Sequence, residues 1–306
     1  MIEISGLTKY YGKYGRPAVS DLSLTVDDGE VLGFVGLNGA GKTTTIRVSA
    51  GIIYPTEGNV WFDGNDIVKD KAKASRQIGW VPEFPNFEPA ARPLNLLIYY
   101  AGYHGIPKAE AERMGRELLS QVGLDDQLNK RLRDYSQGMK KRFSLAASMI
   151  SNPNNYLLDE ILNGLDPEGI KYVRNLILSF KKDGKAVLLS SHMLKELEFV
   201  ADRIAIINKG KLIKVINRDD LKANGKFIVT VQLKNPDEGV MNILSKYGDV
   251  EILDGKYVIS ELKKKNADTT GEINSELVLN KYIVSGITVE NEDLETFFFR
   301  SLGDEQ

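Results

Sequence analysis

The sequence predicts an α/β protein built on a mostly parallel sheet, followed by a smaller α+β domain. Short β-rich runs alternate with helical stretches along the first two-thirds of the 306-residue chain. Two of these runs, YLLD and AVLLSS, are apolar at consecutive positions, which is typical of strands covered on both faces. A polar, turn-rich segment, NRDDLKANGK, then precedes a region with a different order of elements.

Local composition predicts each element of the first domain, which we expect at residues 1–217. Apolar and β-branched runs predict strands at 2–7, 22–26, 31–35, 60–62, 78–81, 155–158, 186–190 and 203–207. Helical spacing, with Pro, Ser or Asp at several starts, predicts helices at 42–50, 93–103, 109–123, 137–150, 167–181 and 194–201. The boundary is expected between residues 215 and 226.

The second domain is expected at residues 226–306. Its pattern predicts a strand at 227–233, a helix at 238–246, a hairpin of 250–253 and 256–259 around Asp254 and Gly255, a helix at 272–284 and a strand at 287–290. This is the ferredoxin-like order, and a further helix is expected at 293–302. No motif in this domain implies chemistry, so dimerisation or regulation and ligand binding are equal alternatives for it.

Composition excludes several kinds of chemistry. The absence of cysteine excludes disulfides, iron–sulfur clusters and a thiol nucleophile, and His104 and His192 alone cannot make a three-histidine metal site. Any metal should therefore be a hard, oxygen-bound cation. With 40 Lys plus Arg against 42 Asp plus Glu, no nucleic-acid partner is expected. The N-terminus lacks a signal-peptide pattern and no apolar run approaches the ~20 residues of a membrane span, which predicts an intracellular, soluble chain.

The strongest local signal is a glycine-rich segment between the strand VLGFV and a helical run. It consists of Gly36, Leu37, Asn38, Gly39, Ala40, Gly41, Lys42, Thr43 and Thr44. This spacing and context predict a phosphate-binding loop, whose backbone N–H groups surround phosphate oxygens at a helix N-terminus. We expect Lys42 to reach the terminal phosphates and the Thr43 hydroxyl to bind Mg²⁺. The alternative is an ordinary glycine turn before a helix. It is disfavoured, because the segment has the full spacing of a phosphate-binding loop between a strand and a helix.

A second signal is the strand YLLDE, which ends in two carboxylates. Side chains alternate along a strand, so Asp159 and Glu160 point in different directions and can hold different roles. We expect Asp159 to join the Mg²⁺ shell and Glu160 to polarise an attacking water. Such a strand end is by itself more often only solvated, but the preceding phosphate loop favours the catalytic interpretation.

Three further segments complete an ordered set: YSQGM at the start of a helix, NGLD after the acid pair, and SSH at the end of a strand. Together with the two signals above, they resemble the motifs of the ATP-binding-cassette (ABC) ATPases over residues 1–217. The resemblance implies a P-loop NTPase fold, with a RecA-like core and antiparallel β and helical subdomains. It also implies that ATP and Mg²⁺ bind and that ATP is hydrolysed.

The resemblance implies roles for two aromatic positions. Tyr11 in KYYG matches the residue that stacks on adenine, with Tyr10 and Tyr14 as alternatives. His192 matches the switch histidine, which contacts the γ-phosphate and orients Glu160 and the water.

The remaining motif residues match groups that act between two subunits. Ser136, Gln137 and Gly138 match the signature that caps the γ-phosphate of the other subunit, and Asp166 matches the acid that bridges the two. The YSQGM variant resembles a subfamily whose ATPases pair with separate, small ABC-2-type permeases.

One departure from the family pattern affects the expected activity. Glu83 in IGWVPE stands where the family has a glutamine that contacts Mg²⁺ and water. A carboxylate can still bind Mg²⁺, but it adds negative charge near the phosphates. We therefore predict weak or partner-dependent ATPase activity. Ile161 and Leu162 also replace the frequent Pro-Thr, which can alter the local turn.

The resemblance implies two partners. One is a second cassette, identical or different, in a head-to-tail dimer; the other is a separate integral membrane permease, with export as the direction. The chain is then expected in the cytoplasm, peripheral on the inner face of the cell membrane. Region 83–103 lies where relatives dock the permease, although most of its large apolar residues are expected to fill the domain's own core.

Two other functions are weighed against transport. One is a soluble ABC ATPase acting on nucleic acid or ribosomes, which usually carries long coiled coils or a second cassette that this sequence lacks. The other is a regulatory subunit that binds ATP with little turnover.

Overall fold

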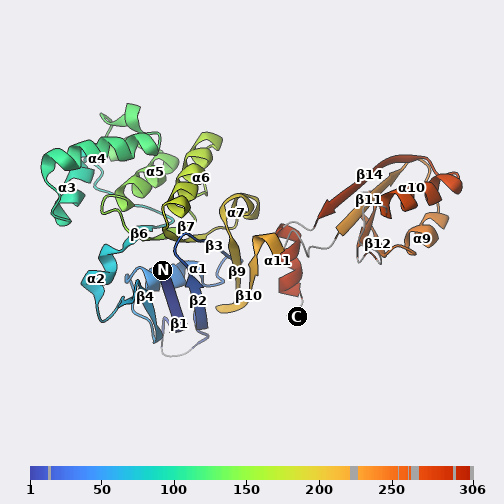
Figure 1. Cartoon of the computed structure of the whole chain (residues 1–306), viewed down its shortest axis with the longest axis horizontal. Coiled ribbons are helices and arrows are strands. Elements are labelled where there is room, and N and C mark those ends of the chain that lie inside the picture. The colour runs from blue at the N-terminus through green and yellow to red at the C-terminus, as the bar shows by residue number, and fades with distance from the viewer. Residues whose placement is uncertain are drawn as a thin grey trace. The chain divides into compact units, whose positions relative to one another are not determined.

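The computed structural model describes residues 1–12, 15–220, 227–253, 255–260, 262, 269–291 and 294–303 (Figure 1). The chain divides into two compact units, Met1–Asn217 and Arg218–Gln306. Among the described residues, none of the helices has both the length and the apolar character needed to cross a membrane.

The first unit is built on a six-stranded sheet in the order β10-β9-β3-β8-β7-β6. The strands are β3 (Val31–Val35), β6 (Ile78–Val81), β7 (Asn155–Asp159), β8 (Ala186–Ser190), β9 (Arg203–Asn208) and β10 (Lys211–Asn217). Five of them are parallel, and only β10 is antiparallel to its neighbour. Every residue of β3, β7 and β8 is buried, which confirms the prediction of strands covered on both faces.

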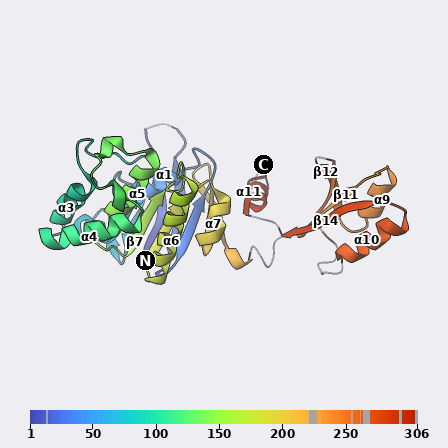
Figure 2. The same ribbon diagram turned by 90° about the horizontal axis from the view of Figure 1, so that it is seen from above.

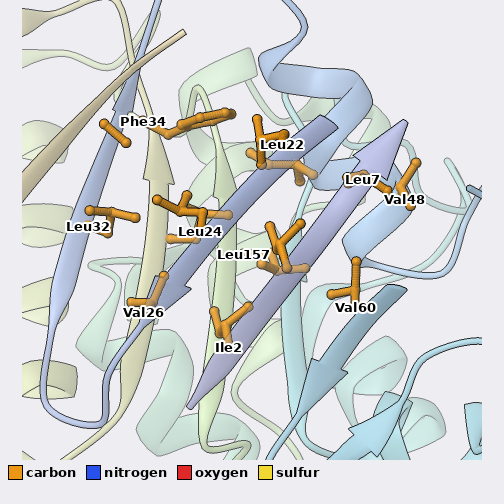
Figure 3. Close-up of a cluster of buried hydrophobic side chains, with 14 of the residues drawn as sticks. Ile2, Leu7, Leu22, Leu24, Val26, Leu32, Phe34, Val48, Val60 and Leu157 are labelled. Atoms are coloured by element: carbon orange, nitrogen blue, oxygen red, sulfur yellow. The ribbon is translucent and has the colours of Figure 1, made fainter. Parts of the chain in front are cut away.

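A second sheet covers part of the first unit's core. It contains β1 (Ile2–Lys9), β2 (Val19–Val26), β4 (Glu57–Phe62) and β5 (Asn65–Asp66) in the antiparallel order β2-β1-β4-β5. Its inward side chains, such as Ile2 and Leu22, share one hydrophobic cluster with Phe34 and Leu157 of the main sheet (Figure 3). Burial of this apolar surface holds the two sheets together.

The helices of the first unit begin close to the predicted residues. They are α1 (Lys42–Ser49), α2 (Lys71–Arg76), α3 (Pro93–Tyr103), α4 (Lys108–Gln121), α5 (Gln137–Ser148), α6 (Pro167–Lys182) and α7 (Leu194–Val200), with short turns η1 (Asp125–Gln127) and η2 (Leu132–Asp134). The neighbouring helices α3 and α4 lie side by side in both views (Figures 1 and 2). The sequence did not predict α2 or the two short turns.

The second unit contains the predicted order of strand, helix, strand, strand, helix, strand. Its elements are β11 (Phe227–Leu233), α9 (Gly239–Leu244), β12 (Asp249–Leu253), β13 (Lys256–Ser260), α10 (Thr269–Leu279), β14 (Val284–Asn291) and α11 (Leu294–Gly303). The sheet is antiparallel in the order β12-β13-β11-β14, and its core includes Val231, Ile259 and Leu277. Predicted turn residue Asp254, residues 221–226 of the predicted boundary and residue 293 lie outside the described residues.

The sequence misplaced one helix of the second unit. The helix expected at 272–284 begins at Thr269 and ends at Leu279, because Lys281 adopts a left-handed φ of 66° and the chain then enters β14. The sequence also missed β10, which pairs with β9 through a two-residue loop. Both loop residues, Lys209 and Gly210, have positive φ (47° and 82°), as a tight hairpin turn requires.

Candidate functional site

The strand order places the predicted motifs at one edge of the main sheet. Strands β3, β8, β7 and β6 are parallel neighbours, so their carboxyl ends coincide. The glycine-rich loop follows β3, the SSH segment ends β8, the acid pair ends β7, and Glu83 follows β6. In parallel sheets, ligands bind at this edge.

Two glycines of the loop are required by close backbone packing. A Cβ atom on Gly36 would lie 2.4 Å from the carbonyl oxygen of Ile207, and one on Gly41 would lie 2.6 Å from that of Ala18. Gly41 also has a φ of 111° and caps the N-terminus of α1. The loop therefore packs closely at the N-terminus of α1. The free N–H groups at this helix end suit the binding of an anion.

Lys42 lies in a cleft of about 410 Å³, a volume typical of small-molecule sites. The cleft is lined by residues 38–44 together with Ala18, Glu83, Glu160, Asn163 and His192. The Lys42 Nζ atom donates to the Gly36 carbonyl at 2.7 Å and lies 3.5 Å from Glu160 Oε1. A larger hollow of about 720 Å³, lined in part by α4 and α6, contains none of the predicted site residues.

Asp159 is buried and accepts hydrogen bonds from two hydroxyl groups. Ser190 Oγ donates to Asp159 Oδ1 at 2.7 Å, and Thr43 Oγ1 donates to the same oxygen at 3.3 Å. Burial raises the pKa of Asp159, although these two hydrogen bonds act in the opposite direction. A hydroxyl and a carboxylate fit Mg²⁺, which takes few protein oxygens and completes its shell with water and substrate phosphates.

Glu160, His192 and Asn163 form a hydrogen-bonded triangle. Glu160 Oε2 lies 3.1 Å from His192 Nδ1 and accepts a hydrogen bond from Asn163 Nδ2 at 3.0 Å, while the latter two atoms are 3.2 Å apart. Glu160 is buried, whereas the side chain of His192 is more than half exposed. A carboxylate held in this way at the edge of a cleft can accept a proton from a water molecule.

The main chain of Glu160 is strained and held from both sides. Its φ of 48° is left-handed, a conformation that costs a non-glycine residue about 1–3 kcal/mol. Its N–H donates to Ser190, with distances of 3.1 Å to the carbonyl oxygen and 3.0 Å to Oγ. Its carbonyl accepts from Lys141 Nζ at 2.5 Å.

Lys141 is a buried lysine of α5. Burial lowers the pKa of its ammonium group, and the nearby carboxylates of Glu83, Glu160 and Asp159 act in the opposite direction. Lys141, Asn163 and Ser190 were not among the site residues predicted from the sequence. Periodicity offered a signal for Lys141, which is three and four residues before the buried Ser144 and Leu145 on one helix face.

Tyr11 lies beside the end of the glycine-rich loop. Its hydroxyl is 3.3 Å from Thr44 Oγ1, and 65% of the residue is exposed. Tyr10 is less exposed, at 38%, and Tyr14 lies outside the described residues. Tyr11 is therefore an exposed aromatic residue next to the cleft, with Lys9 Nζ over its ring at 5.7 Å from the centroid.

The residues expected to act on a second subunit do not line this cleft. Ser136 caps α5 by accepting from the Met139 N–H at 3.2 Å, and Asp166 caps α6 by accepting from the Gly169 N–H at 2.9 Å. Gly138 faces Gly164, whose carbonyl oxygen would be 3.4 Å from a Cβ at position 138. Ser136, Gln137 and Asp166 are exposed. None of these four residues lines the cleft that contains the phosphate loop.

The fold and the cleft define a P-loop nucleotide-binding protein. Comparison with known proteins gives the family. The ABC transporter family profile matches residues 19–163. The ABC transporter ATP-binding protein YhcH of Bacillus subtilis is 35% identical, with 99% of this chain and 96% of the relative covered. The bacitracin transport ATP-binding protein BcrA of Bacillus licheniformis is also 35% identical, with 99% and 97% covered.

A solved structure supports the fold. A dimeric ATP-binding cassette, in a post-hydrolysis state with ADP and phosphate bound, matches with a TM-score of 0.66 at 23% identity, over 71% of this chain and 99% of the other. The chain belongs to the ABC transporter ATP-binding proteins. It is an ATP-binding and ATP-hydrolysing subunit that powers transport.

Proposed function

We propose that the chain acts as a head-to-tail dimer, with itself or with a second cassette, and drives export through a separate integral membrane permease. The main observation is the separation of two clusters in one chain. The cleft contains Lys42 and Glu160, whereas Ser136 and Asp166 are exposed elsewhere. A second copy can complete each cleft, as the dimeric state of the similar cassette suggests.

Within each cleft, different side chains bind the nucleotide and activate the attacking water. Lys42 and the loop N–H groups bind the β- and γ-phosphates, and Tyr11 stacks on adenine. Glu160 accepts a proton from the attacking water, while His192 and Asn163 hold its carboxylate in place. Thr43 and Asp159 would hold Mg²⁺, which would supply positive charge to the phosphates when bound.

Glu83 is proposed as a further Mg²⁺ or water contact that tunes the rate. It lines the cleft with Glu160, so the site contains two carboxylates near the position of the γ-phosphate. Like charge near a phosphate raises the free energy of the negatively charged transition state. Turnover by the isolated chain is then slow until a partner rearranges this region.

The proposed second subunit contributes the signature and the bridging acid. The exposed Ser136 hydroxyl, Gln137, the Gly138 main chain and the N-terminus of α5 would cap the γ-phosphate held by the first subunit. Asp166 would form the bridge between the subunits. ATP affinity and dimer affinity are then linked, because each complete site needs both chains.

The permease would bind this chain at the surface between β6 and α3. The chain would then lie on the cytoplasmic face of the cell membrane. Of the large apolar residues of region 83–103, Leu96 and Leu97 are buried, but Phe84 and Tyr99 are 74% and 59% exposed. Exposed aromatic residues are frequent anchors of protein interfaces. Because one relative is a bacitracin transport protein, a bacitracin-type peptide is the first cargo to test.

The test uses Glu160→Gln, which keeps the shape of the side chain and removes the base. With Mg-ATP, we expect this variant to accumulate as a dimer on a sizing column, whereas Glu160→Gln combined with Lys42→Met stays monomeric. If Glu160→Gln remains monomeric with saturating Mg-ATP, both alone and with membranes from the native host, the proposed dimer is contradicted. The permease is tested by identifying the integral membrane protein that co-purifies with the chain and loses binding on Phe84→Ala.

A further inference from the structure

Lys141 is a buried cation without a role in the reaction steps described above. It is 5% exposed, and it does not line the cleft that contains Lys42. An ammonium group is costly to bury unless hydrogen bonds and opposite charges compensate. A methionine would fill a similar space with no charge to desolvate. A lysine at this position therefore needs a polar explanation.

The explanation lies in the main chain of Glu160. The Nζ atom of Lys141 donates to the Glu160 carbonyl, while Ser190 accepts from the Glu160 N–H. These contacts hold both sides of a residue whose φ is left-handed. Such strain persists only where the surrounding contacts determine the conformation.

Relaxation of this strain would change the direction of the Glu160 side chain. The carboxylate is now within hydrogen-bond distance of both Asn163 and His192. A rotation about the Glu160 backbone would move it away from these partners, since side chains follow their Cα–Cβ bonds. Small displacements of a general base lower the rate steeply, because proton transfer requires hydrogen-bond reach.

Charge supports the same arrangement. The carboxylates of Glu83, Asp159 and Glu160 all act on the ammonium group of Lys141. Lys42 is a cation on the cleft side of this cluster, where it lines the proposed phosphate site. Lys141 is a second cation near these carboxylates, and Arg47 also acts on Asp159. Because Lys141 does not line the cleft, it can balance their charge without contacting a ligand.

We propose that Lys141 is a positioning residue of the ATPase reaction. It holds the Glu160 main chain in the left-handed conformation and thereby fixes the direction of the general base. The inference rests on ATP hydrolysis by this chain, and it does not depend on the identity of the permease or the cargo.

The test compares three substitutions of one side chain. Lys141→Met keeps the volume and removes the donor, Lys141→Gln keeps a neutral donor, and Lys141→Arg keeps a charged one. We measure kcat and KM for ATP, the Kd for a fluorescent ATP analogue, and thermal stability. Lys42→Met sets the zero of activity. Lys140→Met is the matched control, because the Lys140 side chain is half-buried and makes no hydrogen bond or ion pair within the described part of the chain.

For Lys141→Met, we expect kcat to fall at least tenfold while the Kd for ATP stays within twofold of the wild-type value. At least one donor variant should recover a third or more of the wild-type kcat, and Lys140→Met should stay within twofold. A wild-type kcat in Lys141→Met overturns the proposal. So does an equal loss of kcat and ATP affinity that neither donor variant restores, since that pattern indicates a purely structural lysine.

The proposal stays testable if Lys141→Met does not fold. Folded donor variants with restored kcat then support it, and folded donor variants without activity overturn it. Failure of all three variants to fold also overturns it, because the role of Lys141 is then structural alone.

Discussion

Two charged side chains of this site, those of Asp159 and Lys141, are buried, and burial disfavours the charged form of each. Burial raises the pKa of Asp159 and lowers that of Lys141, so each group is less favourable in its charged form than it would be in water. The site offsets this cost with hydroxyl and carbonyl partners and with neighbouring opposite charges. Its residues are therefore sensitive to the loss of one partner.

Glu83 gives a first prediction at the residue scale. Glu83→Gln removes a negative charge from the cleft but keeps an oxygen that can contact Mg²⁺ or water. We expect kcat to rise by a few-fold to about tenfold, equivalent to about 1 kcal/mol of activation free energy. Steady-state ATPase assays over a Mg²⁺ titration provide the measurement. Unchanged turnover and Mg²⁺ dependence would contradict the assigned role of Glu83.

Gly36 gives a second prediction at the residue scale. Gly36→Ala places a methyl group 2.4 Å from the Ile207 carbonyl oxygen, so β9 or the loop must shift. We expect a loss of about 1–3 kcal/mol in unfolding free energy, together with weaker ATP binding. Gly102→Ala is the control: its added methyl group meets no atom within 4 Å, and it lies inside α3, so it should be neutral or stabilising. Denaturant titrations of both variants compare them, and equal stabilities would refute the packing argument.

At the scale of elements, a polar contact joins α10 to the segment that follows α9 in the second unit. Glu276 of α10 accepts hydrogen bonds from Lys246 and from the Tyr247 hydroxyl, the latter at 2.6 Å. The ion pair and the hydroxyl contact lower the pKa of Glu276. Burial and this same contact raise the pKa of Tyr247 to about 12.

These shifts predict a pH dependence for α10. A lowered carboxyl pKa contributes stability that is present above the unfolded-state value, near 4.5, and is lost as pH falls through the folded-state value. Glu276→Gln should therefore speed amide exchange in α10 at pH 7. The free energy of opening should fall by no more than about 1 kcal/mol, because the contact is partly solvated. The difference from the wild type should shrink in acid. Hydrogen exchange on the full chain measures it, with the exposed Glu251→Gln as control.

At the scale of the whole molecule, each complete site is proposed to combine two chains. The phosphate loop and the exposed signature would then belong to different subunits of the same site. This arrangement makes a prediction that no single-chain site shares, because defects in the two motifs can complement each other.

Lys42→Met and Ser136→Arg chains should each lack ATPase activity alone. After mixing at equal concentration, each dimer that contains one of each has one intact site of its two, so about a quarter of the wild-type sites return if the chains pair at random. A chain carrying both substitutions, mixed with wild type, is the control for subunit exchange. Absence of recovered activity in exchanged mixtures would refute composite sites.

The sequence by itself determined the motifs and the class of fold. The spacing of Gly36, Gly41 and Lys42 reflects backbone and phosphate geometry within one short segment, so it is legible without a structure. The apolar runs of β7 and β8 likewise record burial on both faces. Local patterns of this kind predicted most of the motif residues that line the cleft.

Tertiary structure alone decided how distant residues meet. The contact of Ser190 with Asp159 depends on the pairing of β7 with β8, and the contact of Lys141 with the Glu160 carbonyl depends on where α5 packs. The sequence also misplaced the end of α10, since a left-handed residue such as Lys281 leaves little trace in a helical pattern. Strand order and helix packing are non-local, so residues that act through them carry no motif of their own.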